Sequence, residues 1–218
     1  HYDGAEWKKM ESDTDAELYG VWGSSGTDLF VMGYNWGTGK NVILHYDGVK
    51  WIPMQSGKGT PLHGVWGSSG SDIFAVGFNL WEGDESVILH YDGAEWSPVR
   101  ALIAQITDIW GSSDTDIWAI GTGILHYDGS EWKPRYTGGD WNTELYGIWG
   151  SSDSDIFVIG ESGIILHYDG AKWKKMESGT DAKLEDVWGS SDTNIFAVGE
   201  SGLILHCDGA EWRQMESG

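Results

Sequence analysis

Residues 148–173 read IWGSSDSDIFVIGESGIILHYDGAKW, and this stretch decides the fold because the chain repeats it. Its second half, H-Y-D-G-x-x-W, begins at residues 1, 45, 90, 126 and 167 and returns as H-C-D-G-A-E-W at residue 206. Its first half holds a tryptophan that recurs at spacings of 44, 44, 39 and 39 residues, namely Trp22, Trp66, Trp110, Trp149 and Trp188. A regular spacing near forty residues indicates a repeat architecture.

Each repeat contains four short apolar or alternating segments that we interpret as strands. In the fourth repeat they are Leu145–Trp149, Ile156–Ile159, Ile164–Leu166 and Trp173–Met176. The dipeptide Asp169-Gly170 separates the last two, and Asp-Gly is a strong signal for a hairpin turn. Four strands in a unit of about forty residues are typical of one blade of a β-propeller.

We therefore predict an all-β protein, a five-bladed β-propeller of four-stranded antiparallel blades, forming a single domain over residues 1–218. The expected blades are about 18–54, 62–99, 106–135, 145–176 and 184–215. The outer-strand phrase occurs six times, so residues 1–12 form a surplus half-blade. Either Trp7–Met10 or Trp212–Met215 closes the propeller ring, and the other is redundant or pairs with a neighbouring chain. A larger ring that has been truncated is the alternative.

The repeat resembles the highly repetitive bacterial propeller repeats of the form V-W-G-S-S-x-x-D-I-F-A-V-G-x-x-G-x-I-L-H-Y-D-G-x-x-W, over the whole chain. The Ser-Ser-Asp turn is also loosely similar to the Asp-box turn of sialidase-like propellers, although its aromatic residue falls one position early. A five-bladed ring resembles tachylectin-type lectins in architecture alone. Because such repeats are found in predicted surface and secreted proteins, the resemblance implies an extracellular or cell-surface location.

The composition narrows the classes of partner. A formal charge of −21 with only 13 basic residues argues against nucleic acid, whose binding requires clustered Lys and Arg. We expect no membrane insertion, because no apolar run approaches transmembrane length. The single cysteine, Cys207, allows no intramolecular disulfide. The chain starts at His1 inside a repeat, which suggests a fragment or a processed piece.

The repeated polar residues are interpreted as scaffold, and we predict no metal site and no cofactor. Histidines in equivalent positions of different blades lie too far apart to share an ion, which needs three or four ligands at about 2.0–2.3 Å. The Asp-x-Asp turns at Asp114/Asp116 and Asp153/Asp155 offer too few oxygens for calcium. Capping of a tight turn explains these aspartates better.

Function is expected where the copies differ, in the loops between second and third strands and in the connections between blades. These segments carry extra aromatic residues, and Trp36, Trp81 and Trp141 have no role in the repeat. Exposed aromatic residues beside Asn and Gly suit stacking on a sugar or anchoring a protein. His63 is the one histidine outside the repeated phrase. The candidate ligand-binding residues are Tyr34, Asn35, Trp36, Phe78, Asn79, Trp81, Trp141 and His63.

These features predict a non-catalytic binding propeller that recognises a glycan or a protein through this variable face. A structural surface-array or adhesin segment, with self-association through the surplus strand, is the alternative. A glycoside-acting enzyme is less favoured. Asp108 with Glu185 or Asp186 would be the carboxylate pair of such an enzyme, and no arginine cluster of the sialidase type is present.

Overall fold

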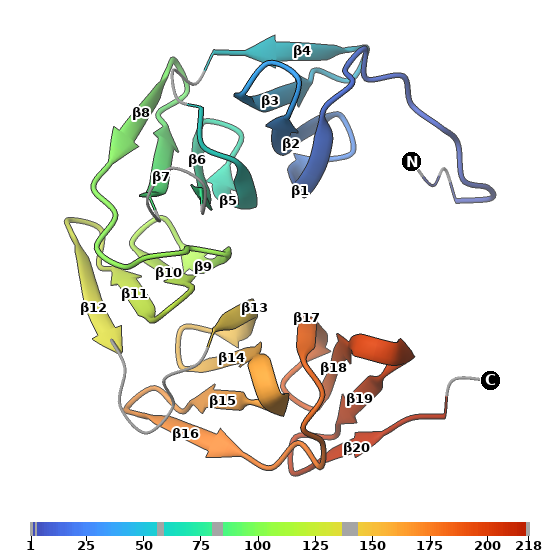
Figure 1. The fold of residues 1–218 in the computed structure, drawn as a ribbon, viewed down its shortest axis with the longest axis vertical. Helices are drawn as coiled ribbons and strands as arrows, with labels where there is room; N and C mark the ends of the chain where they lie inside the picture. Colours follow the sequence, from blue (N-terminus) through green and yellow to red (C-terminus); the bar gives the residue numbers. More distant parts are fainter. Residues whose placement is uncertain (1, 3, 56–58, 80–84, 137–143, 217–218) are drawn as a thin grey trace.

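The computed structural model describes residues 2, 4–55, 59–79, 85–136 and 144–216, and they form five four-stranded antiparallel sheets. Each sheet is a meander in which consecutive strands pair (Figure 1). The first strand of every sheet lies innermost and the fourth outermost, so each sheet is one propeller blade. The predicted fold class is confirmed.

The strand bounds repeat from blade to blade. Blade 1 contains β1 (Glu17–Ser25), β2 (Asp28–Asn35), β3 (Lys40–Tyr46) and β4 (Trp51–Met54). Blade 2 contains β5 (Leu62–Ser69), β6 (Asp72–Asn79), β7 (Glu85–Tyr91) and β8 (Trp96–Val99). Blade 3 contains β9 (Asp108–Ser113), β10 (Asp116–Ile120), β11 (Ile124–Tyr127) and β12 (Trp132–Tyr136).

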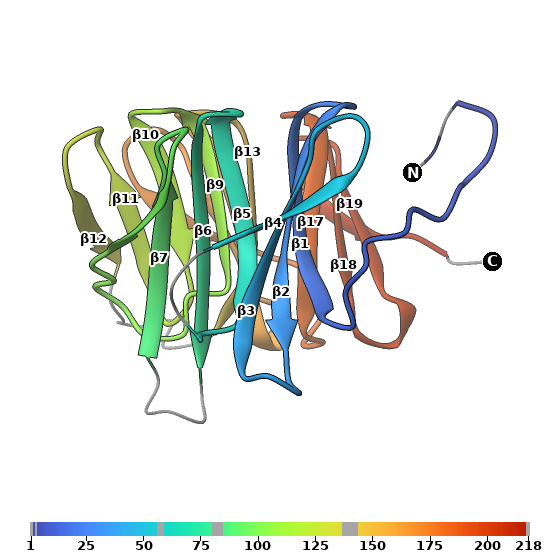
Figure 2. The ribbon, with the colours of Figure 1, turned by 90° about the horizontal axis from the view of Figure 1, so that it is seen from above.

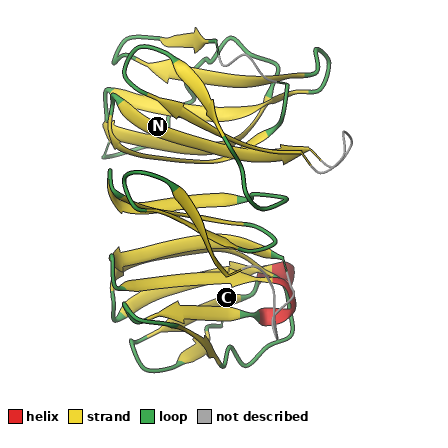
Figure 3. Cartoon of the chain, turned by 90° about the vertical axis from the view of Figure 1, so that its left-hand side faces the viewer, coloured by secondary structure: helices red, strands yellow, loops and turns green. Residues whose placement is uncertain are grey.

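Blade 4 contains β13 (Leu145–Ser152), β14 (Asp155–Gly160), β15 (Ile165–Tyr168) and β16 (Trp173–Met176). Blade 5 contains β17 (Leu184–Ser191), β18 (Asn194–Gly199), β19 (Ile204–Cys207) and β20 (Trp212–Gln214). The short 3-10 turns η2 (Glu161–Gly163) and η3 (Glu200–Gly202) are the helical segments drawn in Figure 3, which otherwise shows strands and loops.

The second and third strands are the most buried because neighbouring blades cover both of their faces. Residues of β10 and β14 such as Ile117 and Ile156 are fully buried, as is Leu166 on β15. This burial explains why these strands are almost continuously apolar in sequence. The inner and outer strands contain more exposed or half-buried residues, as the edges of a sheet do.

Each repeated histidine holds a turn of its own blade. In blade 3 the Nε2 atom of His126 lies 2.6 Å from Oδ1 of Asp116, and Ser112 donates its hydroxyl to Oδ2 of the same carboxylate at 2.6 Å. The imidazole also packs on Trp118, with 4.2 Å between ring centroids. The histidine-to-aspartate contact recurs in blades 1, 2 and 4 through His45, His90 and His167, and in blade 5 His206 contacts Asn194 in place of an aspartate. The repeated histidines therefore link adjacent strands within a blade.

Neighbouring blades meet through a contact that uses a glycine. The indole of Trp110 in blade 3 lies against Gly150 of blade 4, so closely that a Cβ on that glycine would be 2.6 Å from the Trp110 Cη2 atom. Trp22, Trp66 and Trp149 lie in the same way against Gly67, Gly111 and Gly189. Four apolar clusters fill these four junctions. The glycine of the repeated W-G pair is thus required by the approach of the preceding blade.

The five blades form an arc in which blade 1 and blade 5 lie apart (Figure 1). Strand β20 of the chain's own C-terminal region completes blade 5. The described part of the N-terminal surplus segment forms only an isolated bridge between Tyr2 and Trp7, and it projects away from the blades (Figure 2). The outer strand of blade 5 is therefore supplied by Trp212–Gln214 and not by Trp7–Met10.

Candidate functional site

The two ends of the blades differ in character. The tight repeated turns between first and second strands and between third and fourth strands lie at one end. The loop between β2 and β3 and the turns η2 and η3 lie at the opposite end, which is at the bottom of Figure 2. We call this second end the variable face. The structure thus gathers on one side the segments in which the repeats differ.

An aromatic cluster spans blades 1 and 2 on the variable face. It begins with Tyr34 and Trp36, whose ring centroids lie 4.7 Å apart in an edge-to-face arrangement. It continues through Tyr19 to His63 at 5.2 Å, and from His63 to Phe78 at 4.7 Å. Four of the predicted residues, Tyr34, Trp36, His63 and Phe78, therefore belong to one aromatic cluster.

Trp36 is the exposed part of this cluster. Its side chain is 52% exposed, whereas Tyr34 beneath it is 7% exposed. The indole Nε1 donates toward Glu17 Oε2 at 3.2 Å and toward the Tyr19 hydroxyl at 3.3 Å. These bonds orient the indole and leave a large part of its surface open to a ligand.

Glu17 is the charged group of the cluster. The Tyr19 hydroxyl donates to its carboxylate at 2.6 Å. This hydrogen bond and the one from Trp36 hold the pKa of Glu17 below its usual value, so the carboxylate is charged at neutral pH. Our sequence reasoning missed Glu17. The signal that identifies it is the tetrapeptide E-L-Y-G, which occurs at residues 17–20 and again at 144–147 with the same Tyr-to-Glu bond.

His63 lies between two aromatic rings and is largely buried. Burial lowers its pKa, although a backbone hydrogen bond at Phe78 acts in the opposite direction. The imidazole is therefore neutral at pH 7, and it contributes an aromatic surface rather than a positive charge.

The other predicted residues have different positions. Asn35 accepts the backbone N–H of Thr38 through Oδ1 at 2.9 Å and so shapes the β2–β3 loop. Asn79 is buried at the end of β6 and is 5% exposed. Trp81 and Trp141 lie outside the described residues. Neither asparagine is positioned as an exposed ligand-binding group.

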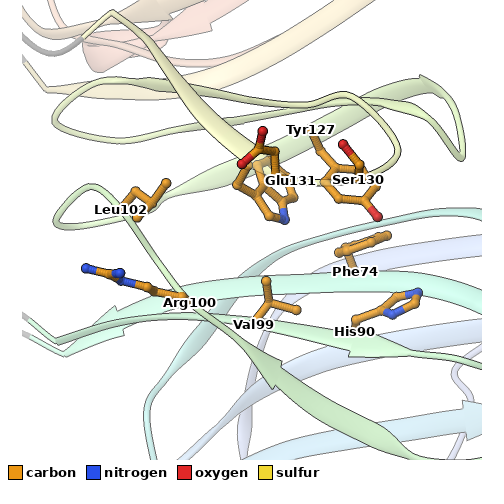
Figure 4. A pocket seen from close by; sticks show the side chains of 9 residues that line it. Phe74, His90, Val99, Arg100, Leu102, Tyr127, Ser130 and Glu131 are labelled. Atoms are coloured by element: carbon orange, nitrogen blue, oxygen red, sulfur yellow. The ribbon is translucent and has the colours of Figure 1, made fainter.

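A hollow lies between blades 2 and 3, on the outer side of the blades. It has a volume of about 400 Å³. Figure 4 shows Val99 and Arg100 on one wall and Ser130 and Glu131 on the opposite wall, with Phe74 at one end. A related hollow between blades 3 and 4 has Trp118 in the position of that phenylalanine. Both hollows are lined largely by residues of the repeat, which distinguishes them from the aromatic cluster.

Asp108 does not have the surroundings of a glycosidase carboxylate. Its Oδ1 accepts the backbone N–H of Ile109 at 2.8 Å, and its Oδ2 accepts that of Ile148 in the next blade at 3.2 Å. Burial raises the pKa of Asp108 to about 7, and the nearby charge of Asp186 adds to the effect. With both oxygens bonded to backbone amides, Asp108 links blades 3 and 4.

The Ser–Asp–His sets of the blades also differ from a catalytic triad. In the described sets the aspartate lies between the other two side chains, as Asp116 does between Ser112 and His126. A nucleophilic serine must instead be hydrogen-bonded to the histidine that removes its proton. Among the described residues, no group of three His, Cys, Asp or Glu side chains is placed to hold a metal ion, and no helix is long and apolar enough to cross a membrane.

Comparison with known proteins gave structural likeness alone. No family model matches the chain, and no curated protein matches its sequence. Among solved structures, YCF48 bound to D1 peptide shares 16% sequence identity at a TM-score of 0.70, with 98% of this chain and 73% of that chain covered. The WD40 repeats of RRP9 share 10% identity at a TM-score of 0.68, with 90% of this chain and 64% of that chain covered.

The SapL1 lectin in complex with alpha methyl fucoside is similar at 16% identity and a TM-score of 0.62, over 93% of this chain and 80% of that chain. Identities this low show the propeller fold alone. These neighbours comprise a peptide-bound protein, a WD40 protein and a lectin.

Proposed function

We propose that this chain is a non-catalytic binding module that holds a positively charged segment of a protein partner at the aromatic cluster of blades 1 and 2. The observation that carries the proposal is the exposed indole of Trp36 beside the charged carboxylate of Glu17. An aromatic face next to a carboxylate suits a lysine or arginine side chain, which gains a cation–π contact and an ion pair together.

Blade 4 supports this choice of ligand. Its E-L-Y-G segment repeats the tyrosine-to-glutamate bond of blade 1, from Tyr146 to Glu144 at 2.6 Å. There the ammonium group of Lys183 lies over the Tyr146 ring, 4.1 Å from its centroid. Among the described residues, no Lys or Arg nitrogen forms a salt bridge with Glu17 of blade 1. The charge of the Glu17 carboxylate is therefore left to pair with a cation from a partner.

The net charge of the whole molecule also favours a basic partner. A net charge of −21 attracts a basic segment over a distance and speeds its association at low ionic strength. The YCF48 neighbour was solved bound to D1 peptide, and this supports a peptide as the ligand of a propeller with a similar fold. A glycan is the second candidate, since stacking on Trp36 would also suit a sugar and the SapL1 neighbour is a lectin bound to a fucoside.

A displayed peptide library screened beside a glycan array tests the proposal. We expect enriched peptides to contain Lys or Arg, and we expect Trp36→Ala and Glu17→Gln each to weaken their binding by about tenfold or more. Trp7→Ala removes another exposed tryptophan, 80% exposed and outside the cluster, and should leave binding unchanged. Binding that survives Trp36→Ala, or binding of glycans and no peptides, would contradict the proposal.

A further inference from the structure

Each blade has a leading face toward the next blade in sequence and a trailing face toward the preceding one. The leading face carries the repeated tryptophan of the inner strand, and the trailing face carries the glycine against which that tryptophan packs. Four junctions join the five blades. The leading face of blade 5 and the trailing face of blade 1 are the two faces without a neighbouring blade (Figure 1).

The leading face of blade 5 is exposed where the same face of the other blades is covered. Trp188, the tryptophan of this face, is 60% exposed. Val198 of β18 is 42% exposed, whereas the residues in register with it in the other blades are 0% exposed, namely Met32, Val76, Ile120 and Ile159. The exposure of Val198 is therefore caused by the missing neighbour and not by the position in the repeat.

The trailing face of blade 1 shows the complementary exposure. Val21 is 69% exposed, whereas its counterparts Ile109, Ile148 and Val187 are 4–5% exposed and Val65 of blade 2 is half-buried. Gly23 is exposed, and a Cβ placed on it would meet only atoms of blade 1. A Cβ placed on Gly67, Gly111, Gly150 or Gly189 would instead contact the tryptophan of the preceding blade. No tryptophan therefore lies against Gly23, and the atom nearest to such a Cβ is Leu29 Cδ2 of blade 1 itself.

A polar contact that is present at one junction has its two halves on the uncovered faces as well. At the junction of blades 3 and 4, Asp108 accepts a backbone N–H from Ile148. Asp186 occupies the same position in blade 5. Its Oδ1 accepts the backbone N–H of the following residue, Val187, at 2.8 Å, as Oδ1 of Asp108 accepts that of Ile109. The residue equivalent to Ile148 on blade 1 is Val21. The carboxylate of Asp186 and the backbone N–H of Val21 are therefore complementary. They lie on the same two faces as Trp188 and Gly23.

We propose that these two faces bind each other between molecules, so that blade 5 of one copy packs on blade 1 of a second copy. The four internal junctions indicate which surface binds an exposed leading face, because each of them joins a leading face to a trailing face of the same repeat. The contact is head-to-tail and joins two different surfaces, so an assembly grows by successive addition unless its geometry closes. It uses blade faces and does not require the N-terminal surplus segment.

Light scattering of the intact chain over about a hundredfold range of concentration tests the proposal. We expect the average mass to rise with concentration above the 24.0 kDa of one chain. Each copy carries a charge of −21, so added salt should strengthen the association by screening repulsion. A mass of one chain throughout would overturn the proposal, and so would an association that salt weakens.

A pair of single-face variants tests the head-to-tail geometry. Trp188→Ser with Val198→Asp damages the leading face alone, and Val21→Asp damages the trailing face alone. All three side chains are exposed, so both variants should fold, and circular dichroism checks this. Each variant by itself should remain a monomer. An equimolar mixture should form a 1:1 dimer and nothing larger, because one good leading face meets one good trailing face.

Other outcomes of the mixing experiment would refute this arrangement. If one variant still self-associates, a face-to-face contact between like surfaces is present instead. If both folded variants stay monomeric when mixed, the two faces do not bind each other. Removal of residues 1–12 serves as the control for pairing through the N-terminal segment, and the proposal expects it to leave the mass of the wild-type assembly, counted in chains, unchanged.

Discussion

Replacing Asp108 with asparagine should remove part of the pH dependence of the unfolding free energy and leave the packing of the blades unchanged. Asp108 occupies a position where blades 1, 2 and 4 have glycine, and its carboxyl group is enclosed at the junction of blades 3 and 4. Burial raises its pKa from 3.8 to about 7. Asparagine has nearly the same shape and no charge, so the variant removes the titration while the junction keeps its packing.

The expected size of the effect follows from the pKa. The folded protein holds the proton of Asp108 more tightly than the unfolded chain does. This contribution to stability is fully present below pH 3.8 and is lost as the pH rises through about 7. One pKa unit corresponds to 1.36 kcal/mol, so the wild-type protein loses about 4 kcal/mol over that range and the variant does not.

The variant also loses a hydrogen bond, and this loss does not depend on pH. An asparagine oxygen can still accept the N–H of Ile109, but the amide nitrogen cannot accept that of Ile148, which costs about 1–3 kcal/mol. As the pH rises from acid to neutral, the unfolding free energy of the wild-type protein should therefore fall by about 4 kcal/mol relative to that of the variant. This change is the quantity to measure.

Urea unfolding at a series of pH values between about 3.5 and 7.5 provides the measurement. Asp153→Asn, in the exposed turn between β13 and β14, controls for the loss of one negative charge. A difference between Asp108→Asn and wild type that stays constant over the pH range would refute the reasoning. So would a difference of the same size in the control.

Three further predictions concern the scaffold and are checked by urea unfolding at low protein concentration. Trp110→Ala should cost about 3 kcal/mol because it empties a blade junction, while Trp188→Ala should cost less than about 0.5 kcal/mol because that side chain is exposed. Gly150→Ala should cost about 1–3 kcal/mol because its Cβ would lie 2.6 Å from Trp110, whereas Gly26→Ala, with nothing within 4 Å, should be near neutral. Asp116→Asn should be mild, since blade 5 carries asparagine in the same role, but Asp116→Ala should cost about 1–3 kcal/mol.

Much of the architecture could be predicted from the sequence because each blade is encoded locally. The spacing of the W-G-S-S and H-Y-D-G phrases indicates the number of repeats, and Asp-Gly marks the hairpin turns. The strands follow because their apolar residues are contiguous within a few positions. The local role of the repeated histidines could also be predicted, since equivalent positions on different blades cannot converge on one ion.

The site was predicted in part. Tyr34, Trp36 and Phe78 could be identified as departures from the repeat, and they share a cluster because all lie at one end of neighbouring strands. Glu17 was missed because its position immediately before β1's apolar residues gives no sign of the indole that reaches back to it across 19 residues. Which of the candidate asparagines is buried also depends on the packing of the loops and could not be inferred from residue type.

The sequence by itself determined the blades, because a blade is built from contacts within about forty residues. Only the tertiary structure decided what happens between the first blade and the last. The same W-G pair encodes a covered junction at Trp110 and an uncovered face at Trp188, and nothing in the local sequence distinguishes them. The curvature of the stack is the sum of the rotations at four junctions, and that sum leaves β1 and β17 apart (Figure 1).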